Sequence, residues 1–183
     1  MKKVLFFIAM LIPMVSFAQK ADDAKKLTKF EEFTSKTGTI VKFVDVNLPR
    51  LRLNYGSLET GIRTIKKTPN SYFYRLEKGE TSTSNARIAM IEYSDLVEIN
   101  KALDVLASEI DSDMASSPYY LENKFRTVDG FEIGYYISKG AVSWFMKLER
   151  YSNSTVFPSD RMSLITAFKD AQSKIEELKA SGK

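Results

Sequence analysis

Apolar and polar residues alternate with a period of two along most of the chain between residues 39 and 157, and such alternation predicts β-strands. The strands predicted in this way are Thr39 to Val46, Leu51 to Tyr55, Leu58 to Lys66, Tyr72 to Lys78, Arg87 to Tyr93, Tyr119 to Val128, Phe131 to Ser138, Ala141 to Arg150 and Thr155 to Phe157. Three other stretches place apolar residues three or four positions apart, which predicts amphipathic helices. These are Ala21 to Lys36, Ser94 to Asp113, and Asp160 to Ala180.

One seven-residue pattern occurs twice in the chain. Tyr72 to Lys78 and Trp144 to Arg150 both read aromatic, Phe, bulky apolar, basic, Leu, Glu, basic. Each copy is followed by a short polar linker, an apolar segment and a Ser-Asp pair that opens a long helix. This order indicates an internal duplication of a unit of four strands and one helix, at about residues 39–114 and 118–181.

Short turns join the predicted strands within each unit, and strands joined in this way pair as antiparallel neighbours. The sequence therefore predicts an α+β fold: a large, twisted antiparallel sheet with both long helices on one face, preceded by the N-terminal helix. A half-closed barrel with helices is the alternative, because about nine strands tend to curl. Residues 19–183 are expected to form a single domain.

Three local signals refine the connections between strands. Asn47-Leu48-Pro49 is expected to break the first strand, because proline cannot donate a hydrogen bond to a sheet. Asp129-Gly130 predicts a two-residue hairpin turn in which both residues have positive φ. The polar segment from Gly79 to Asn85 is expected to be a mobile loop.

The period of two also assigns the faces of the repeated strand. The face expected under the long helices carries Tyr72, Tyr74, Leu76, Trp144, Met146 and Leu148. The opposite face carries Phe73, Arg75, Glu77, Phe145, Lys147 and Glu149, with Tyr136 added from the neighbouring strand. Trp144 is the only tryptophan, and its place on the helix side favours a core role over sugar stacking.

The face opposite the helices combines charged residues with large aromatic ones. Phe73, Tyr136 and Phe145 are expected to form one aromatic cluster there, and an apolar patch of this kind needs a cover. The first helix, a second subunit or partner, and a small ligand are the possible covers. The charged residues of the same face either hold a polar ligand or form ion pairs on a wet surface.

The chain has 183 residues and contains neither histidine nor cysteine. The absence of both excludes histidine-dependent nucleophiles, disulfides, and imidazole or thiolate metal ligands. An enzyme of this sequence must therefore use carboxylate, lysine or tyrosine chemistry. No phosphate-binding glycine loop, nucleophile motif or metal-ligand spacing occurs, so no catalytic residue, metal or cofactor is predicted.

The first 18 residues predict a secretory signal peptide. Lys2 and Lys3 precede an apolar run, and the small residues Ser16 and Ala18 suit a cleavage site, so cleavage is expected after Ala18. The run is shorter than the roughly 20 residues that a membrane-spanning helix needs, and no second run reaches that length. The protein is therefore expected to be periplasmic or secreted, with no nucleic-acid partner.

These observations predict an exported binding or protein-interaction module whose contact surface lies on the sheet face opposite the long helices. The candidate binding residues are Phe73, Arg75, Glu77, Tyr136, Phe145, Lys147 and Glu149. The partners that suit such a surface are a second copy of the chain, an envelope protein, a small molecule or a glycan. Two other functions stay open: a hydrolase or lyase of the cell envelope based on carboxylates and tyrosine, and a structural envelope protein.

Overall fold

The computed structural model describes residues 27–80, 86–150 and 155–182. The expected signal peptide, residues 21–26 of the expected first helix, residues 81–85 of the expected loop and the linker at 151–154 lie outside the described residues. The strands are β1 (Lys42–Arg52), β2 (Ser57–Lys66), β3 (Ser71–Lys78), β4 (Arg87–Glu92), β5 (Tyr120–Arg126), β6 (Glu132–Ser138), β7 (Ala141–Lys147) and β8 (Thr155–Val156). The helices are α1 (Lys29–Thr34), α2 (Tyr93–Ala115) and α3 (Arg161–Ala180).

The strands of the described residues form two antiparallel sheets of four, in the orders β1-β2-β3-β4 and β5-β6-β7-β8. One long helix follows each sheet in the chain, α2 after the first and α3 after the second. A bridge between Leu53 and Pro158 joins the two sheets, just after the ends of β1 and β8. The α+β class and the antiparallel pairing are therefore confirmed, and both sheets are open, so the alternative of a half-closed barrel is wrong.

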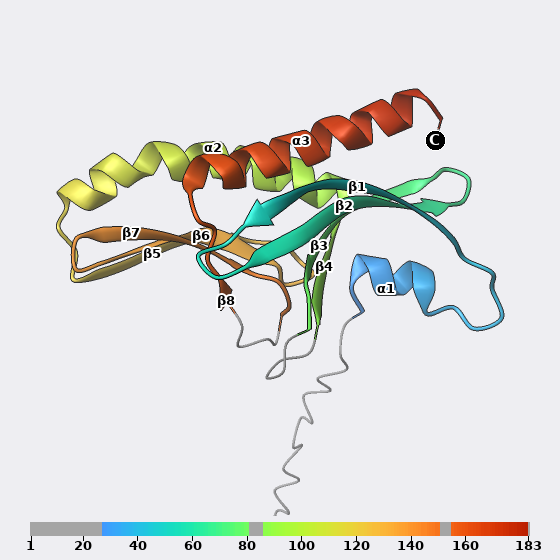
Figure 1. Ribbon diagram of the computed structural model, residues 1–183, viewed down its shortest axis with the longest axis horizontal. Helices are drawn as coiled ribbons and strands as arrows, with labels where there is room; N and C mark the ends of the chain where they lie inside the picture. The colour runs from blue at the N-terminus through green and yellow to red at the C-terminus, as the bar shows by residue number, and fades with distance from the viewer. Residues whose placement is uncertain (1–26, 81–85, 151–154, 183) are drawn as a thin grey trace, which may run out of the picture.

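Both long helices pack on the same side of the strands, and α1 lies on the other side (Figure 1). Helix α3 contacts β1, β2 and β3, whereas α2 contacts β5 and β6 as well as β3 and β4. Each long helix thus reaches strands of the other half, and the buried apolar residues form one core. Phe168 of α3 joins the halves, because its ring lies 5.2 Å from Tyr74 of β3 and 6.1 Å from Phe131 next to β6.

The faces of the repeated strand agree with the period-of-two prediction. All six residues expected under the long helices belong to the buried core. Trp144 keeps 8% of its surface exposed and packs against Tyr135 at 5.4 Å, so its predicted core role is confirmed. The first copy of the repeated pattern lies in β3, the third strand of its sheet, and the second copy begins in β7, the third strand of the other sheet.

Strand β1 is continuous from Lys42 to Arg52, so the expected break at residues 47–49 is wrong. Its pairing with β2 shifts register between Leu48 and Leu51, and this irregularity accommodates Pro49. Strand β1 is the outer strand of its sheet, where a proline is tolerated because its missing N–H need not face a partner. The Pro49 carbonyl oxygen still accepts a hydrogen bond from the Thr60 hydroxyl at 2.8 Å.

The hairpin turn at Asp129-Gly130 is correctly placed, but its expected conformation is wrong. Gly130 has a φ of 91°, whereas Asp129 does not have a positive φ. The Thr127 N–H donates to the Phe131 carbonyl oxygen at 2.9 Å, and the Gly130 N–H donates to the Thr127 carbonyl oxygen at 3.0 Å. These bonds close a three-residue loop, in which a turn is followed by a left-handed glycine.

Helix α1 begins at Lys29, whereas Leu27 and Thr28 are not helical. Its start is fixed by a capping box, in which the Thr28 hydroxyl accepts from the Glu31 N–H at 3.1 Å and the Glu31 carboxylate accepts from the Thr28 N–H at 2.8 Å. Thr28 itself has an extended backbone. Of the described part of the predicted helix, residues 27–36, only Lys29–Thr34 are helical.

Two further element ends differ from the prediction. Glu92 rather than Ser94 caps α2, whereas Asp160 caps α3 as expected. Strand β7 ends at Lys147 instead of continuing to residue 150. As a consequence, Glu149 lies beyond the strand rather than on the sheet face.

Gly134 of β6 is a position where the sheet has no room for a side chain. A Cβ atom there would lie 2.2 Å from the Asn123 carbonyl oxygen and 2.7 Å from Lys124 Cα, both on β5. We expect Gly134→Ala to lower the free energy of unfolding by about 2–3 kcal/mol, because β5 must move away. Gly79→Ala is the control, since a Cβ at Gly79 meets nothing within 4 Å. Urea unfolding compares the two variants, and equal stabilities would contradict the close approach of β5 to β6.

Candidate functional site

Phe73 lies on the sheet face opposite the long helices and has no exposed surface. Helix α1 covers it: the ring of Phe30 lies 5.3 Å from the ring of Phe73, and that of Phe33 lies 6.1 Å away, both near edge-on. Phe30 also lies 6.0 Å from Phe43 of β1. Of the covers that the sequence suggested for this face, the first helix is the one that packs on Phe73.

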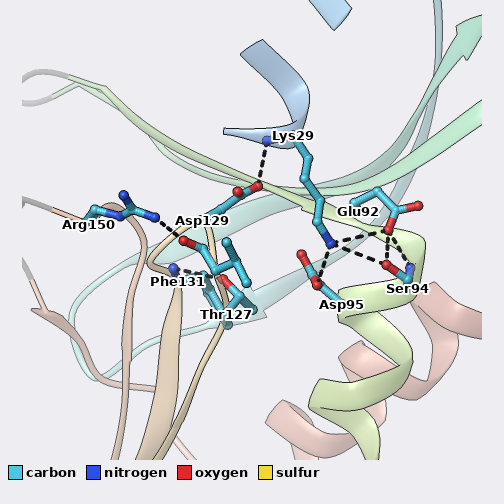
Figure 2. Close-up of polar contacts among 9 residues, drawn as sticks. Lys29, Glu92, Ser94, Asp95, Thr127, Asp129, Phe131 and Arg150 are labelled. Carbon is cyan, nitrogen blue, oxygen red and sulfur yellow. Dashed lines mark hydrogen bonds and ion pairs between the residues drawn. The ribbon is translucent and has the colours of Figure 1, made fainter. Parts of the chain in front are cut away.

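Lys29 fastens the start of α1 to two other elements (Figure 2). Its ammonium nitrogen lies 2.7 Å from Asp95 Oδ1 and 3.8 Å from Glu92 Oε2, at the start of α2. Its backbone N–H donates to Asp129 Oδ2 at 2.9 Å, in the turn between β5 and β6. Burial alone would lower the pKa of Lys29, but the hydrogen bond and the charge of Asp95, with smaller contributions from Glu92 and Asp129, raise it overall.

A cleft of about 590 Å³ opens beside α1. Its walls are α1, strand β4, the turn between β5 and β6, and the residues that follow β7. The apolar side chains of the lining are Phe30, Ile88, Ala89, Met90, Ile91, Phe131 and Leu148, and the charged ones are Glu31, Arg63, Asp95, Asp129, Glu149 and Arg150. The cleft therefore combines apolar contact with four carboxylates, of which Asp95 is paired with Lys29 and Glu31 accepts from the Thr28 N–H.

The carboxylate of Asp129 lies in an unfavourable place for a charge. Burial raises its pKa, and the charge of Asp95 adds to the rise, while the hydrogen bond from the Lys29 backbone and the charges of Lys29 and Arg150 oppose it. Arg150 donates to the Val128 carbonyl oxygen and so ties the segment after β7 to the turn (Figure 2). Gly130 makes room for this arginine, because a Cβ there would lie 2.5 Å from Arg150 Cβ.

Ion pairs occupy much of the remaining outer face of the first sheet. Arg75 pairs with Glu77 on the same strand. Arg63 of β2 donates two hydrogen bonds to Asp45 of β1, at 2.8 and 2.6 Å, and these bonds lower the pKa of Asp45. Arg75 and Glu77 thus form an ion pair with each other, which is one of the two roles suggested by the sequence.

A separate aromatic cluster lies on the outer face of the second sheet. Tyr136 of β6 lies 6.3 Å from Phe145, 6.4 Å from Phe157 and 6.2 Å from Tyr120, measured between ring centres. Phe145 keeps only 6% of its surface exposed, whereas Tyr120 keeps 54%. Phe145 is therefore buried beside Tyr136 of the same sheet, and Tyr120 forms the open side of the cluster.

The structure distributes the predicted binding residues over three places. Phe73, Arg75 and Glu77 lie on the first sheet, Tyr136, Phe145 and Lys147 on the second, and Glu149 at the cleft. The expectation of one cluster of Phe73, Tyr136 and Phe145 is wrong, because Phe73 belongs to a different sheet from the other two.

No pattern in the sequence marks Lys29, Asp95 or Asp129 as a site residue. The Asp-Gly signal placed Asp129 in a turn, and the Ser-Asp pair placed Asp95 in the first turn of a helix. Neither local signal indicates that these two segments, more than 30 positions apart, meet at the start of α1.

In the described part of the chain, no group of three or more acidic side chains is arranged to hold a metal ion. None of the helices described is both long and apolar enough to cross a membrane. No protein-family model matches this chain, and comparisons with curated proteins and with solved structures give no significant match. The geometry of the cleft and of the sheet faces is therefore what supports a function.

The raised pKa of Asp129 makes stability depend on pH. An acid whose pKa is higher in the folded than in the unfolded chain destabilises the fold above its folded-state pKa, and this cost fades as the pH falls toward the unfolded-state pKa. Asp129→Asn removes the charge and keeps an oxygen for the Lys29 N–H. We expect this variant to be at least as stable as the wild type near pH 7, with an advantage that shrinks as the pH falls through the raised pKa. Urea unfolding between about pH 7 and pH 3 measures the difference, and a less stable variant near pH 7 would contradict it.

Proposed function

We propose that this protein is an exported binding module and that its ligand site is the cleft beside α1. Export rests on the signal peptide expected at residues 1–18. The cleft carries the proposal, since its volume of about 590 Å³ falls within the roughly 300–1,000 Å³ that is typical of small-molecule sites. Glu149, one of the residues that the sequence marked for binding, lines it.

The chemistry of the lining indicates the class of ligand. Apolar side chains such as Phe30, Ile88 and Phe131 suit a hydrocarbon or aromatic group. Four carboxylates line the cleft against the guanidinium groups of Arg63 and Arg150 and the Lys29 ammonium that pairs with Asp95, so the site keeps a net negative charge that favours a cation over an anion. The proposed ligand is a small amphipathic molecule with an amine or another cationic group.

Asp129 is the residue proposed to receive the cationic group. Asp95 already has the Lys29 ammonium at 2.7 Å, whereas Asp129 has no ion-pair partner within 4 Å in the part of the chain that the structure describes. A positive charge beside a buried carboxylate offsets the cost of its burial. A bound amine is therefore expected to lower the pKa of Asp129 and to stabilise the fold.

A hydrolase or lyase based on carboxylates is the second candidate, because Asp95 and Asp129 line the same cleft. Such enzymes need one carboxyl group protonated and another charged at the same pH. Burial raises the pKa of Asp129, and the Asp95 carboxylate lies 2.7 Å from the Lys29 ammonium, so the two acids of the cleft have different surroundings. Chemical turnover of a ligand that binds in the cleft, lost in Asp129→Asn, would favour this candidate over simple binding.

A structural role in the envelope and the internal duplication both stay predictions from the sequence. Recovery of the protein in an insoluble cell-wall or outer-membrane fraction would favour the structural role. Recovery in a soluble exported fraction would favour the binding module.

Three probes with the same eight-carbon tail and different heads test the proposed ligand class: octylamine, octanoate and octyl glucoside. Calorimetry of the purified protein is expected to give octylamine a dissociation constant about tenfold or more below that of octanoate. Ile88→Trp places a larger ring in the lining and is expected to weaken octylamine binding about tenfold. Ile88 is 43% exposed, so this change is expected to leave the fold intact.

Val44→Trp is the matched control, because Val44 is 39% exposed on β1 and does not line the cleft. Its affinity for octylamine is expected to equal that of the wild type. Equal weakening in both variants would place the binding outside the cleft. Failure of all three probes to bind, or a preference for octanoate, would contradict the proposed ligand class.

A further inference from the structure

Strand β5 has a free edge. It is the outermost strand of the second sheet and pairs only with β6 within the described residues. Among the other outer strands, β1 meets the segment after β8 through the Leu53–Pro158 bridge, and β4 lines the cleft beside α1. An open edge presents unpaired backbone N–H and C=O groups, with which another strand can pair.

A second copy of β5 can pair with this edge in an antiparallel register centred on Asn123. Residues that lie directly opposite each other in such a pair point to the same face of the sheet. A twofold axis perpendicular to the sheet keeps the outward faces of both copies on one side. In such a pair, an even-numbered residue must lie opposite an even-numbered one, and an odd-numbered residue opposite an odd-numbered one. The register centred on Asn123 meets this condition and pairs all residues of Tyr120–Arg126.

The side chains of β5 are complementary to themselves in this register. On the outward face, Tyr120 lies opposite Arg126 of the second copy and Glu122 lies opposite Lys124; on the helix side, Leu121 lies opposite Phe125, and Asn123 lies opposite its own counterpart. Asn123 keeps its own amide hydrogen bonds to Glu109 and Tyr135 within each chain. The other pairs join an aromatic ring with a guanidinium, two opposite charges, and two apolar side chains. Each of these is a favourable cross-strand combination.

We propose that two copies of this chain form a symmetric dimer by pairing their β5 strands. The pairing joins the second sheets of the two copies into one continuous antiparallel sheet, with the long helices of both copies on the same side. Leu121 and Phe125 are partly buried against the core of a single chain, and the second copy removes more of their apolar surface from water. Tyr120, which is 54% exposed, gains Arg126 of the second copy as a neighbour.

Symmetric antiparallel pairing of two β4 strands gives no comparable set of complementary side chains. The two longest symmetric registers of Arg87–Glu92 place Ile88 opposite either Glu92 or Met90, and neither register pairs Arg87 with Glu92. Complementarity is thus a property of β5 and not a general feature of the outer strands in this chain. The proposal is also independent of the cleft, which lies at β4.

The charged side chains of β5 already form ion pairs on the outward face of the second sheet. The Lys124 ammonium lies 2.6 Å from Glu122 and 3.2 Å from Glu132 of β6, and Arg126 lies 3.4 Å from Glu132. Glu122 of the second copy therefore joins an existing network of opposite charges. Replacing Lys124 by an acid leaves these carboxylates facing one another in the dimer.

The oligomeric mass in solution tests the proposal. Sedimentation of the purified protein is expected to give twice the mass of one chain, which is 20.8 kDa before any cleavage. Lys124→Glu places like charges opposite each other on both sides of the axis, and is expected to raise the dimer dissociation constant at least about tenfold. The double variant Glu122→Lys/Lys124→Glu restores opposite charges across the axis and is expected to recover the dimer. Lys174→Glu is the control, because it removes an exposed ion pair of 2.8 Å with Glu177 on α3, away from β5.

A single introduced cysteine tests the register independently, since the chain contains none of its own. Opposite residues of an antiparallel pair have Cα atoms about 4.5–5.5 Å apart, which a disulfide can span. Asn123→Cys is therefore expected to cross-link two copies under mild oxidation, whereas Ser173→Cys on the exposed side of α3 is not. A wild-type protein that is monomeric at all concentrations would overturn the proposal. A dimer that neither weakens in Lys124→Glu nor cross-links in Asn123→Cys would overturn it as well.

Discussion

Large apolar side chains on both faces of the first sheet are the constraint on which the arrangement of this protein depends. Tyr74 points to the long helices and packs on Phe168, whereas Phe73 points the other way and is covered by Phe30 and Phe33 of α1. An aromatic side chain of this size carries about 150–250 Å² of surface, so both faces gain from a cover. Helix α1 has six residues and none of them is buried. Its position is therefore set by the ring contacts with the sheet and by the contacts of Lys29.

The position of α1 in turn creates the cleft. Because α1 stands beside β4 and also contacts the turn between β5 and β6, it forms one wall of a space bounded by elements from both halves of the chain. Lys29 is the residue that connects these elements, through Asp95 on one side and Asp129 on the other. Asp129 is partly buried where it accepts the hydrogen bond from the Lys29 N–H, and burial is the main cause of its raised pKa.

Local patterns in the sequence predict the features that depend on neighbouring residues, namely strand faces, helix caps and turns. The period of two correctly assigned Tyr74 and Trp144 to the core, and the Asp160 cap and the Asp-Gly turn were correctly placed. The failures concern relations between distant segments. Pro49 looked like a strand break, because the sequence does not indicate that β1 is an outer strand with an irregular register. Phe73 and Phe145 occupy equivalent places in the repeated pattern, yet Phe73 packs against α1 and Phe145 against Tyr136, and no local pattern distinguishes them. The cleft follows from the same long-range packing and was therefore not predicted.

The contact between α1 and the first sheet is the central claim of this account, and nuclear Overhauser effects between aromatic rings measure it directly. The structure places the ring of Phe73 at 5.3 Å from that of Phe30 and at 6.1 Å from that of Phe33. Selective labelling of phenylalanine is therefore expected to give cross-peaks from Phe73 to both residues in the purified protein. Absence of both cross-peaks, together with ready access of Phe73 to a soluble paramagnetic agent, would contradict the account, because the outer face of the first sheet would then lack the cover that forms the cleft.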